Sequence, residues 1–210
     1  MNIHDFWPDH ETVTSSEQVW YDMIVRRWNT FSEFASIESR NGYLQPTIRF
    51  ATAKGQELVR MIMFRVLEEF AESILAKEEA HWKEELIDGL NYLMVIPLLD
   101  ADICSMKDLA KICHDQTPQR SAGLYYNSQW TASVLGHVTT MLAGELADTF
   151  RNRAWMNQAQ DIYFSGAEVL LDKFATVLYL VVHSFESFDE FWRYFIAKDE
   201  VLQFRLRSKY

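Results

Sequence analysis

Glycine, proline and cysteine are all scarce in this sequence. Its 210 residues include 7 Gly, 4 Pro and 2 Cys. An all-β protein of this size needs many tight turns, which Gly and Pro favour, so their scarcity favours long helices joined by few loops. Cys104 and Cys113 lack the spacing of a metal site and suit a reducing compartment. We therefore expect an all-α, cytoplasmic protein.

Basic residues and long apolar runs are also few. The 20 Lys and Arg against 30 Asp and Glu leave a formal net charge of −10, which is the wrong sign for neutralising DNA phosphates. The longest apolar stretches, residues 93–99 and 175–182, are too short to span a bilayer, and residues 1–10 lack the pattern of a signal peptide. We expect no nucleic-acid partner and no membrane partner, whereas the surplus of acid is compatible with cation binding.

The hydrophobic pattern predicts one helical domain over residues 1–210. Hydrophobic residues make up 49% of the chain, enough for a sizeable core. On the first predicted helix, Arg26 and Arg27 lie off the apolar stripe that contains Trp20 and Ile24. On the second, the predicted buried stripe comprises Leu58, Met61, Ile62, Val66, Phe70 and Ile74. The predicted helices cover about 15–37, 52–77, 82–96, 106–113, 128–151, 166–183 and 187–204.

Two acidic pairs occur on the second and third predicted helices. Glu69 and Glu72 are three residues apart, and so are Glu85 and Asp88, so each pair lies on one face of its helix. Two antiparallel helices that face each other would bring the four carboxylates together. Such a cluster is repulsive on its own, but with two or more Mg²⁺ ions it becomes an oxygen-ligand site suited to a polyphosphate.

A single acidic pair at this spacing is usually part of a solvated helix face. Here the helical wheel places Glu69 and Glu72 beside Val66, Ser73 and Ala76, and the second pair is likewise surrounded by mostly uncharged side chains. Such half-buried surroundings favour a functional role for the two pairs together.

The order of these acids resembles the signature of a known superfamily. Glu68-Glu69-x-x-Glu72, followed after twelve residues by Glu85-x-x-Asp88, resembles the EExxE…ExxD motif of the all-α nucleoside triphosphate pyrophosphohydrolases, which include MazG and the dimeric dUTPases. The C-terminal order also resembles the ending of the dimeric dUTPases and phage dCTPase-dUTPases, and Trp82-Lys83 resembles a Trp-Lys element of that group. The C-terminal residues are Tyr194, Lys198, Asp199, Arg205 and Tyr210.

The resemblance implies Mg²⁺-dependent hydrolysis of a deoxyribonucleoside triphosphate, dUTP or a related pyrimidine nucleotide, to the monophosphate and pyrophosphate, with Mn²⁺ as a substitute metal. It implies that Glu69 orients or deprotonates the attacking water, and that the chain is a homodimer with a variable helical insertion at about 98–165. It also implies a cytoplasmic enzyme, in the host cytoplasm if a phage encodes it. The implied metal ligands are Glu69, Glu72, Glu85 and Asp88, and the candidate substrate-binding residues are Lys83, Lys198, Asp199, Arg205, Tyr210 and, as the nearest base-reading amide, Asn29.

Three departures from the family pattern leave the base preference open. Asp199 stands where the family has Asn, Leu202 where a second Asn is usual, and Lys209 where Gly precedes the last Tyr. The base could be that of dUTP, dCTP, dTTP or a modified nucleotide. The absence of Asn at positions 199 and 202 keeps a different class of function open, a non-catalytic helical binding or scaffold protein whose acidic pairs are surface charge or a remnant metal site.

Overall fold

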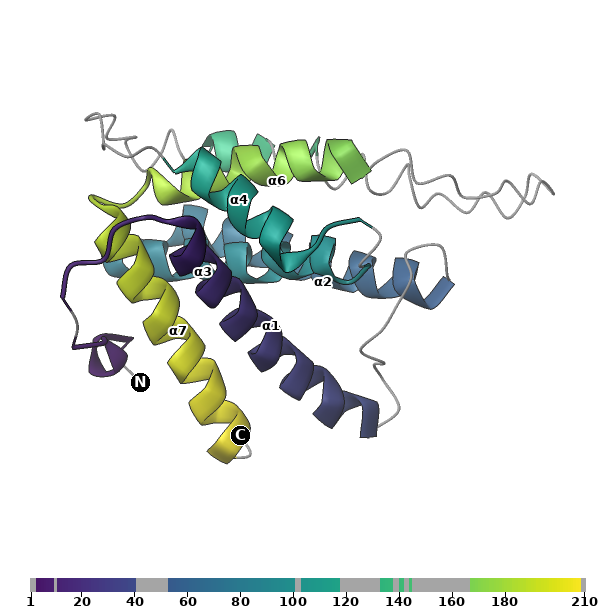
Figure 1. The fold of residues 1–210 in the computed structure, drawn as a ribbon, viewed down its shortest axis with the longest axis horizontal. Helices are drawn as coiled ribbons and strands as arrows, with labels where there is room; N and C mark the ends of the chain where they lie inside the picture. Colours follow the sequence, from purple (N-terminus) through teal and green to yellow (C-terminus); the bar gives the residue numbers. More distant parts are fainter. Residues whose placement is uncertain are drawn as a thin grey trace.

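A computed structural model describes residues 3–9, 11–40, 53–100, 103–117, 133–137, 140–141, 144 and 167–208. In these residues every regular element is a helix, which confirms the all-α expectation (Figure 1). The boundaries of the six α-helices given next lie within a few residues of those predicted, whereas the ends of the helix predicted at about 128–151 lie outside the described residues. The helices are α1 (Glu17–Arg40), α2 (Ala53–Leu75), α3 (Glu79–Val95), α4 (Met106–Gln116), α6 (Ala167–Val182) and α7 (Phe188–Ser208), with short 3-10 helices η1 (Ile3–Phe6) and η2 (Ile96–Leu98).

Helices α2 and α3 form an antiparallel hairpin, with only residues 76–78 between them. The Phe70 ring on α2 packs directly over Gly89 on α3, and a Cβ atom at position 89 would overlap that ring. Glycine at this position therefore allows the two helix axes to approach closely. The contact also sets the register in which residues 69 and 72 of α2 face residues 85 and 88 of α3.

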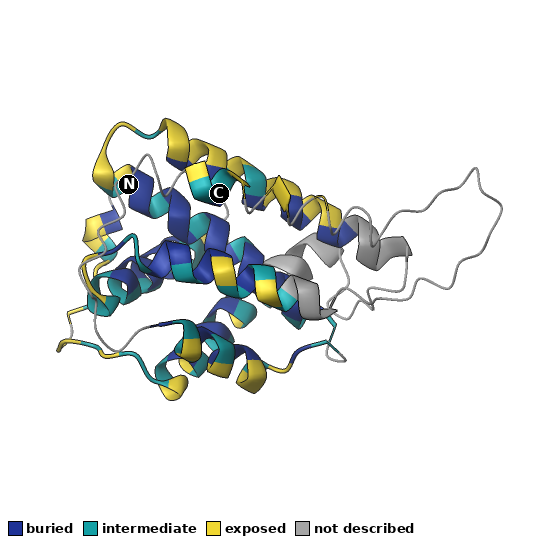
Figure 2. Ribbon diagram, turned by 90° about the horizontal axis from the view of Figure 1, so that it is seen from above, coloured by how far each residue is buried: buried dark blue, intermediate teal, exposed yellow. Residues whose placement is uncertain are grey.

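Helices α1 and α7 run side by side and cross α3 (Figure 1). Near their N-terminal ends, the Trp20 ring packs against Phe188 and Phe191, with centroid distances of 5.6 and 5.4 Å. Helices α4 and α6 complete the bundle, with α4 against α1 and α6 against α3. The buried residues lie on the inward faces of these helices, and the exposed ones lie on the outward faces (Figure 2).

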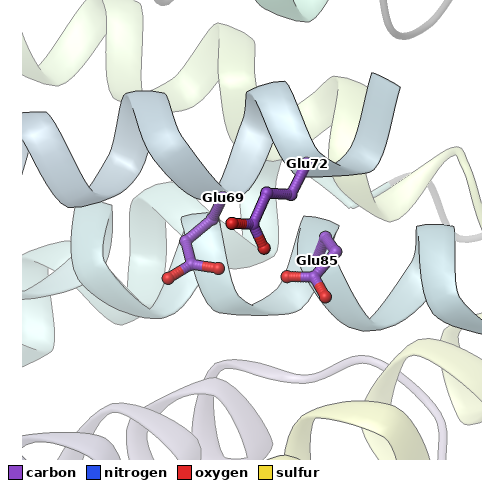
Figure 3. A group of neighbouring side chains, drawn as sticks. All are labelled: Glu69, Glu72 and Glu85. Atoms are coloured by element: carbon purple, nitrogen blue, oxygen red, sulfur yellow. The ribbon is translucent and has the colours of Figure 1, made fainter. Parts of the chain in front are cut away.

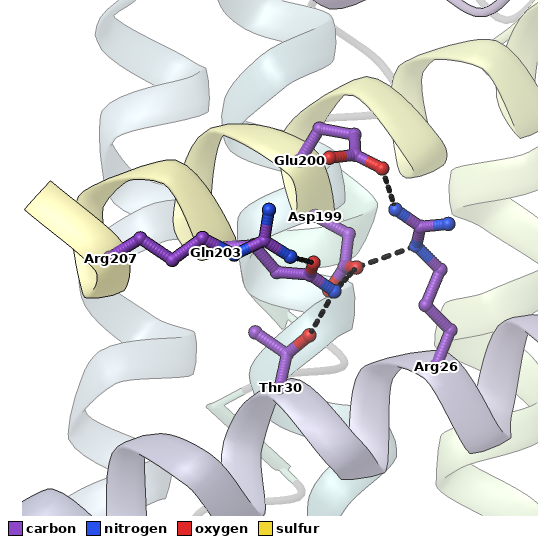
Figure 4. Close-up of polar contacts among 6 residues, drawn as sticks. All are labelled: Arg26, Thr30, Asp199, Glu200, Gln203 and Arg207. Carbon is purple, nitrogen blue, oxygen red and sulfur yellow. Dashed lines mark hydrogen bonds and ion pairs between the residues drawn. The ribbon is translucent and has the colours of Figure 1, made fainter.

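A polar network joins α1 to α7 about two to three turns further along (Figure 4). Arg26 Nε donates to Asp199 Oδ2 at 2.7 Å, and the terminal Nη2 of Arg26 donates to Glu200. Gln203 Nε2 donates to both Asp199 Oδ2 and Thr30 Oγ1. Asp199 is fully buried, so this network fixes α7 against α1 at a position where an unpaired carboxylate would be costly.

Three details of the predicted stripes are wrong. Met61 and Ile74 are 56% and 49% exposed, because about 140° and about 80° around α2 separate them from Val66, the centre of its buried face. Arg27 was placed off the apolar stripe of α1 but is only 6% exposed. It lies seven residues after Trp20, so both side chains point in nearly the same direction toward the core.

The predicted insertion at about 98–165 lies mostly outside the described residues. Within it, α4 begins at a cap in which Ser105 Oγ accepts a hydrogen bond from the Asp108 backbone N–H. Residues 133–137, 140–141 and 144 are helical. Across the described parts of the chain, no helix is long and apolar enough to cross a membrane.

Candidate functional site

Three carboxylates converge where α2 and α3 face each other (Figure 3). Glu69 and Glu72 on α2 and Glu85 on α3 each contribute one oxygen to a group whose members all lie within 4.8 Å of one another. The i,i+3 spacing puts the first two on one face of α2, and the antiparallel hairpin turns that face toward Glu85. Glu72 is exposed, Glu69 is half-buried and Glu85 is buried. The acidic triad, as we name these three residues, is therefore open to solvent on the side of Glu72.

Burial and neighbouring negative charges raise the pKa of the Glu69 carboxyl to about 8. Burial is the largest cause, and the negative charges of Asp88, Glu85 and Glu72 add to it. Glu69 donates a hydrogen bond to Glu85, whose own pKa is raised by burial. Without a cation, burial and the neighbouring charges thus favour the protonated form of Glu69, which reduces the repulsion within the acidic triad.

Asp88, the fourth predicted metal ligand, lies one turn after Glu85 but forms an ion pair with a basic residue. Lys198 Nζ on α7 lies 2.7 Å from Asp88 Oδ2 and 3.6 Å from Glu84 Oε2. Burial raises the pKa of Asp88, while the positive charges of Lys198 and Arg27 act in the opposite direction. Asp88 therefore stands between the acidic triad on one side and two cationic side chains on the other.

The donor atoms of the acidic triad fit a hard divalent cation. Carboxylate oxygens are the protein ligands that Mg²⁺ and Mn²⁺ prefer. A cation there would compete with a proton on Glu69, and its charge would offset the negative charges that contribute to the raised Glu69 pKa. Glu69, Glu72 and Glu85 are the residues that would hold it, and Asp88, one turn further along α3, is paired with Lys198.

An open hollow of about 540 Å³ adjoins the acidic triad at the tip of the α2–α3 hairpin. His81, which lines it, also contacts the triad, since its Nδ1 lies 3.2 Å from Glu85 Oε1. A solvated ligand bound to the triad thus has an open approach from this end. The lining residues are Glu72, Leu75, Ala76, Lys77, Glu78 and His81.

Lys83, predicted to neutralise phosphate, has other partners in the structure. It is buried, and its Nζ lies 2.7 Å from carboxylate oxygens of both Glu79 and Glu190. Around α3, Lys83 is about 160° away from Glu85. It therefore links the start of α3 to the start of α7 and faces away from the acidic triad.

Of the other residues predicted to bind substrate, the structure brings only Lys198 to the acids. Asp199 belongs to the buried network with Arg26, and Asn29 is exposed on α1. Arg205 is exposed in the last turns of α7, two turns beyond Lys198. Tyr210 lies outside the described residues.

Sequence reasoning missed two polar residues that lie beside Asp88. Arg27 comes from α1 and Asn91 from α3, and Arg27 Nε donates to the Asn91 backbone oxygen at 3.3 Å. The Arg27 guanidinium also lies 5.9 Å from the centre of the Tyr92 ring. The available signal was the spacing of Glu85, Asp88 and Asn91, which are three residues apart and so share one face of α3.

Comparison with known proteins gives no relative. No family model, no curated protein and no solved structure matches this chain.

Proposed function

We propose that this protein is a Mg²⁺-dependent pyrophosphohydrolase that converts a pyrimidine deoxyribonucleoside triphosphate, dUTP or a relative, to the monophosphate and pyrophosphate. The observation that supports this most is the convergence of Glu69, Glu72 and Glu85 within 4.8 Å on an antiparallel hairpin, with Asp88 one turn further on. This is the arrangement on which the EExxE…ExxD resemblance depends.

In this proposal the four carboxylates would hold the metals, and neighbouring basic side chains would hold the phosphates. Bound Mg²⁺ would neutralise the charge that develops on the phosphate oxygens. Lys198 lies on the Asp88 side of the site and would transfer its contacts from Asp88 to a phosphate oxygen as the substrate arrives. Arg205, exposed two turns along α7, would reach the outer phosphates.

Glu69 would orient the attacking water and accept its proton. A general base must be ionised to accept a proton, and burial and neighbouring acids hold the pKa of Glu69 at about 8 without metal. Its hydrogen bond to Glu85 holds the carboxyl in place. Metal binding would lower that pKa and leave Glu69 ionised and ready to accept a proton.

We also propose that the protein is a cytoplasmic homodimer. Large apolar side chains are exposed on α2, among them Met61 at 56% and Phe64 at 71%. They lie three residues apart, so they share a face of the helix that the described residues leave uncovered. A second copy would bury such a face in an apolar helical interface.

The experiment is the release of pyrophosphate from dUTP, dCTP, dTTP and the purine deoxynucleotides, with Mg²⁺ and with a chelator. Wild type should turn over a pyrimidine nucleotide only with metal, and Asp88→Ala should abolish turnover while helical content stays the same. If wild type cleaves none of them, the protein belongs to the non-catalytic class, in which the acidic triad serves a binding or scaffold role.

A further inference from the structure

Asn91 is a buried amide that lacks every hydrogen bond its side chain can make. It is 1% exposed, and neither Nδ2 nor Oδ1 has a partner in the structure as described. A buried amide without partners destabilises the fold, because it has lost its hydrogen bonds to water and gained none in the protein. An apolar residue at this core position would avoid that cost, so an unpaired Asn here is explained best by a partner that arrives from outside.

Arg27 lies at the same place and makes few side-chain hydrogen bonds with the described residues. Its side chain lies in the core and has five N–H donors, yet Nε makes the sole hydrogen bond recorded for it with the described residues, a long one of 3.3 Å to the Asn91 carbonyl. Its charge acts on Asp88 and Asp199, but the ion pairs of these two carboxylates are made by Lys198 and Arg26. Its terminal nitrogens therefore remain available to an acceptor.

Both groups continue the site on α3. Residues 85, 88 and 91 follow each other at intervals of three, and Cα–Cβ bonds in a helix tilt toward its N-terminus, so the Asn91 amide leans toward the turn that carries Asp88. Arg27 approaches from α1, with Tyr92 beneath its guanidinium. A molecule whose phosphates sat on the acids at residues 69, 72, 85 and 88, and that extended along α3 away from His81, would meet Arg27 and Asn91.

We propose that Arg27 and Asn91 are the specificity-determining residues of this site and recognise the carbonyl-bearing edge of a pyrimidine base. The inference rests on the proposed function and adds which residues choose the base. Arg27 has only donors and suits a carbonyl oxygen, whereas the Asn91 amide offers one donor and one acceptor face. Together they match the edge of a pyrimidine on which a carbonyl oxygen, a ring nitrogen and the substituent at C4 lie side by side, as in uracil, thymine or cytosine. Adenine has no carbonyl and would leave Arg27 unpaired.

The test compares wild type with Asn91→Leu and Arg27→Met, using kcat/KM for dUTP, dCTP, dTTP and dATP. Wild type should prefer at least one pyrimidine over dATP by 100-fold or more, and each variant should reduce that ratio by about 10- to 100-fold. Gln18→Leu is the matched control, because the Gln18 amide is an exposed group on α1 that donates to Asp22. It should leave the ratio unchanged.

Two further measurements separate recognition from a purely structural role. Asn91→Leu should hold or raise the Tm of the nucleotide-free protein, because it removes an unpaired buried amide. A lower Tm, with equal loss of activity on all four nucleotides, would show that Asn91 has a structural partner such as a buried water, and would overturn the proposal. So would a wild type that prefers dATP.

If wild type hydrolyses nothing, the proposed function fails, and the recognition claim is decided by binding. Calorimetry with deoxyuridine, deoxycytidine, thymidine and deoxyadenosine should then show a pyrimidine nucleoside that binds wild type at least tenfold more tightly than it binds Asn91→Leu. Absence of such binding would overturn the inference on its own.

Discussion

Replacing Glu69 by Gln should stabilise the metal-free protein in a pH-dependent way. The pKa of Glu69 is raised from 4.5 to about 8 in the folded protein, mainly by burial and then by Asp88, Glu85 and Glu72. Between these two values the folded state binds more protons at this group than the unfolded state does. Wild type therefore loses stability as the pH rises from about 4.5 to about 8, and the loss is complete above pH 8. Glu69→Gln carries no such titration.

The size of the effect follows from the shift and from the exposure of the side chain. A rise from 4.5 to about 8 would correspond to about 5 kcal/mol if it were fully realised. Glu69 is only half-buried, so water screens the repulsion, and we expect about 1–2 kcal/mol at pH 8. At pH 4.5 the two proteins should differ little.

The assay is urea unfolding of wild type and Glu69→Gln at pH 4.5, 6, 7 and 8, each with a chelator and with Mg²⁺. Mg²⁺ should stabilise wild type more as the pH rises, since the metal competes with a proton on Glu69, and it should stabilise Glu69→Gln far less. Glu68→Gln is the control, because Glu68 is an exposed neighbour on α2 that pairs with Arg65 at the surface.

Two results would refute this reasoning. One is a Glu69→Gln effect that does not change between pH 4.5 and pH 8, which would mean that no carboxyl repulsion is stored in the acidic triad. The other is a Glu69→Gln protein that is less stable than wild type at pH 8 without metal.

The remaining predictions concern the metal ligands, the counter-ion, the C-terminus and the assembly. Glu72→Ala should reduce Mg²⁺-dependent turnover by about 1000-fold, with circular dichroism unchanged, because Glu72 is exposed and its loss relieves repulsion. Lys198→Met should tighten Mn²⁺ binding by the nucleotide-free protein, because it releases Asp88 from its ion pair. The same variant should raise the KM for the nucleotide about tenfold. Weaker Mn²⁺ binding would show that Lys198 and the metal do not compete for Asp88. Deletion of residues 205–210 should raise the KM for the nucleotide about tenfold and leave Mn²⁺ binding unchanged. Full activity of the truncated protein on every nucleotide would show that these residues do not contact the substrate. Phe64→Glu should convert a dimer into a monomer by light scattering at micromolar concentration, and a monomeric wild type would rule out the dimer.

Helix positions followed from the sequence because they depend on local signals. Apolar spacing and helix-breaking residues located α1, α2, α3, α4, α6 and α7 to within a few residues. The acidic triad was also predictable, since i,i+3 spacing fixes a helix face and a short loop forces an antiparallel hairpin. The orientation of α2 was harder to predict, because Met61 fits an apolar stripe by type, while the position of α3 decides which side is buried.

The polar partners of the site could not be predicted in the same way. Lys83 and Lys198 both lie in motifs that resemble phosphate-binding elements, yet one pairs with Glu79 and Glu190 and the other with Asp88. The difference depends on where α7 crosses α3, and no local pattern encodes a crossing point. For the same reason Arg27 looked like a surface charge on its own helix, although the neighbouring helices enclose it.

The position of the bond that is cleaved tests the account most directly. Wild type should be incubated with Mg²⁺ and its best deoxynucleotide in water enriched in ¹⁸O, and the products should be analysed by ³¹P NMR and mass spectrometry. The account predicts one ¹⁸O atom in the nucleoside monophosphate and none in the pyrophosphate, because water attacks the α-phosphorus, and it predicts no product from Asp88→Ala. Label in inorganic phosphate with formation of the diphosphate, or no product from any nucleotide, would contradict it.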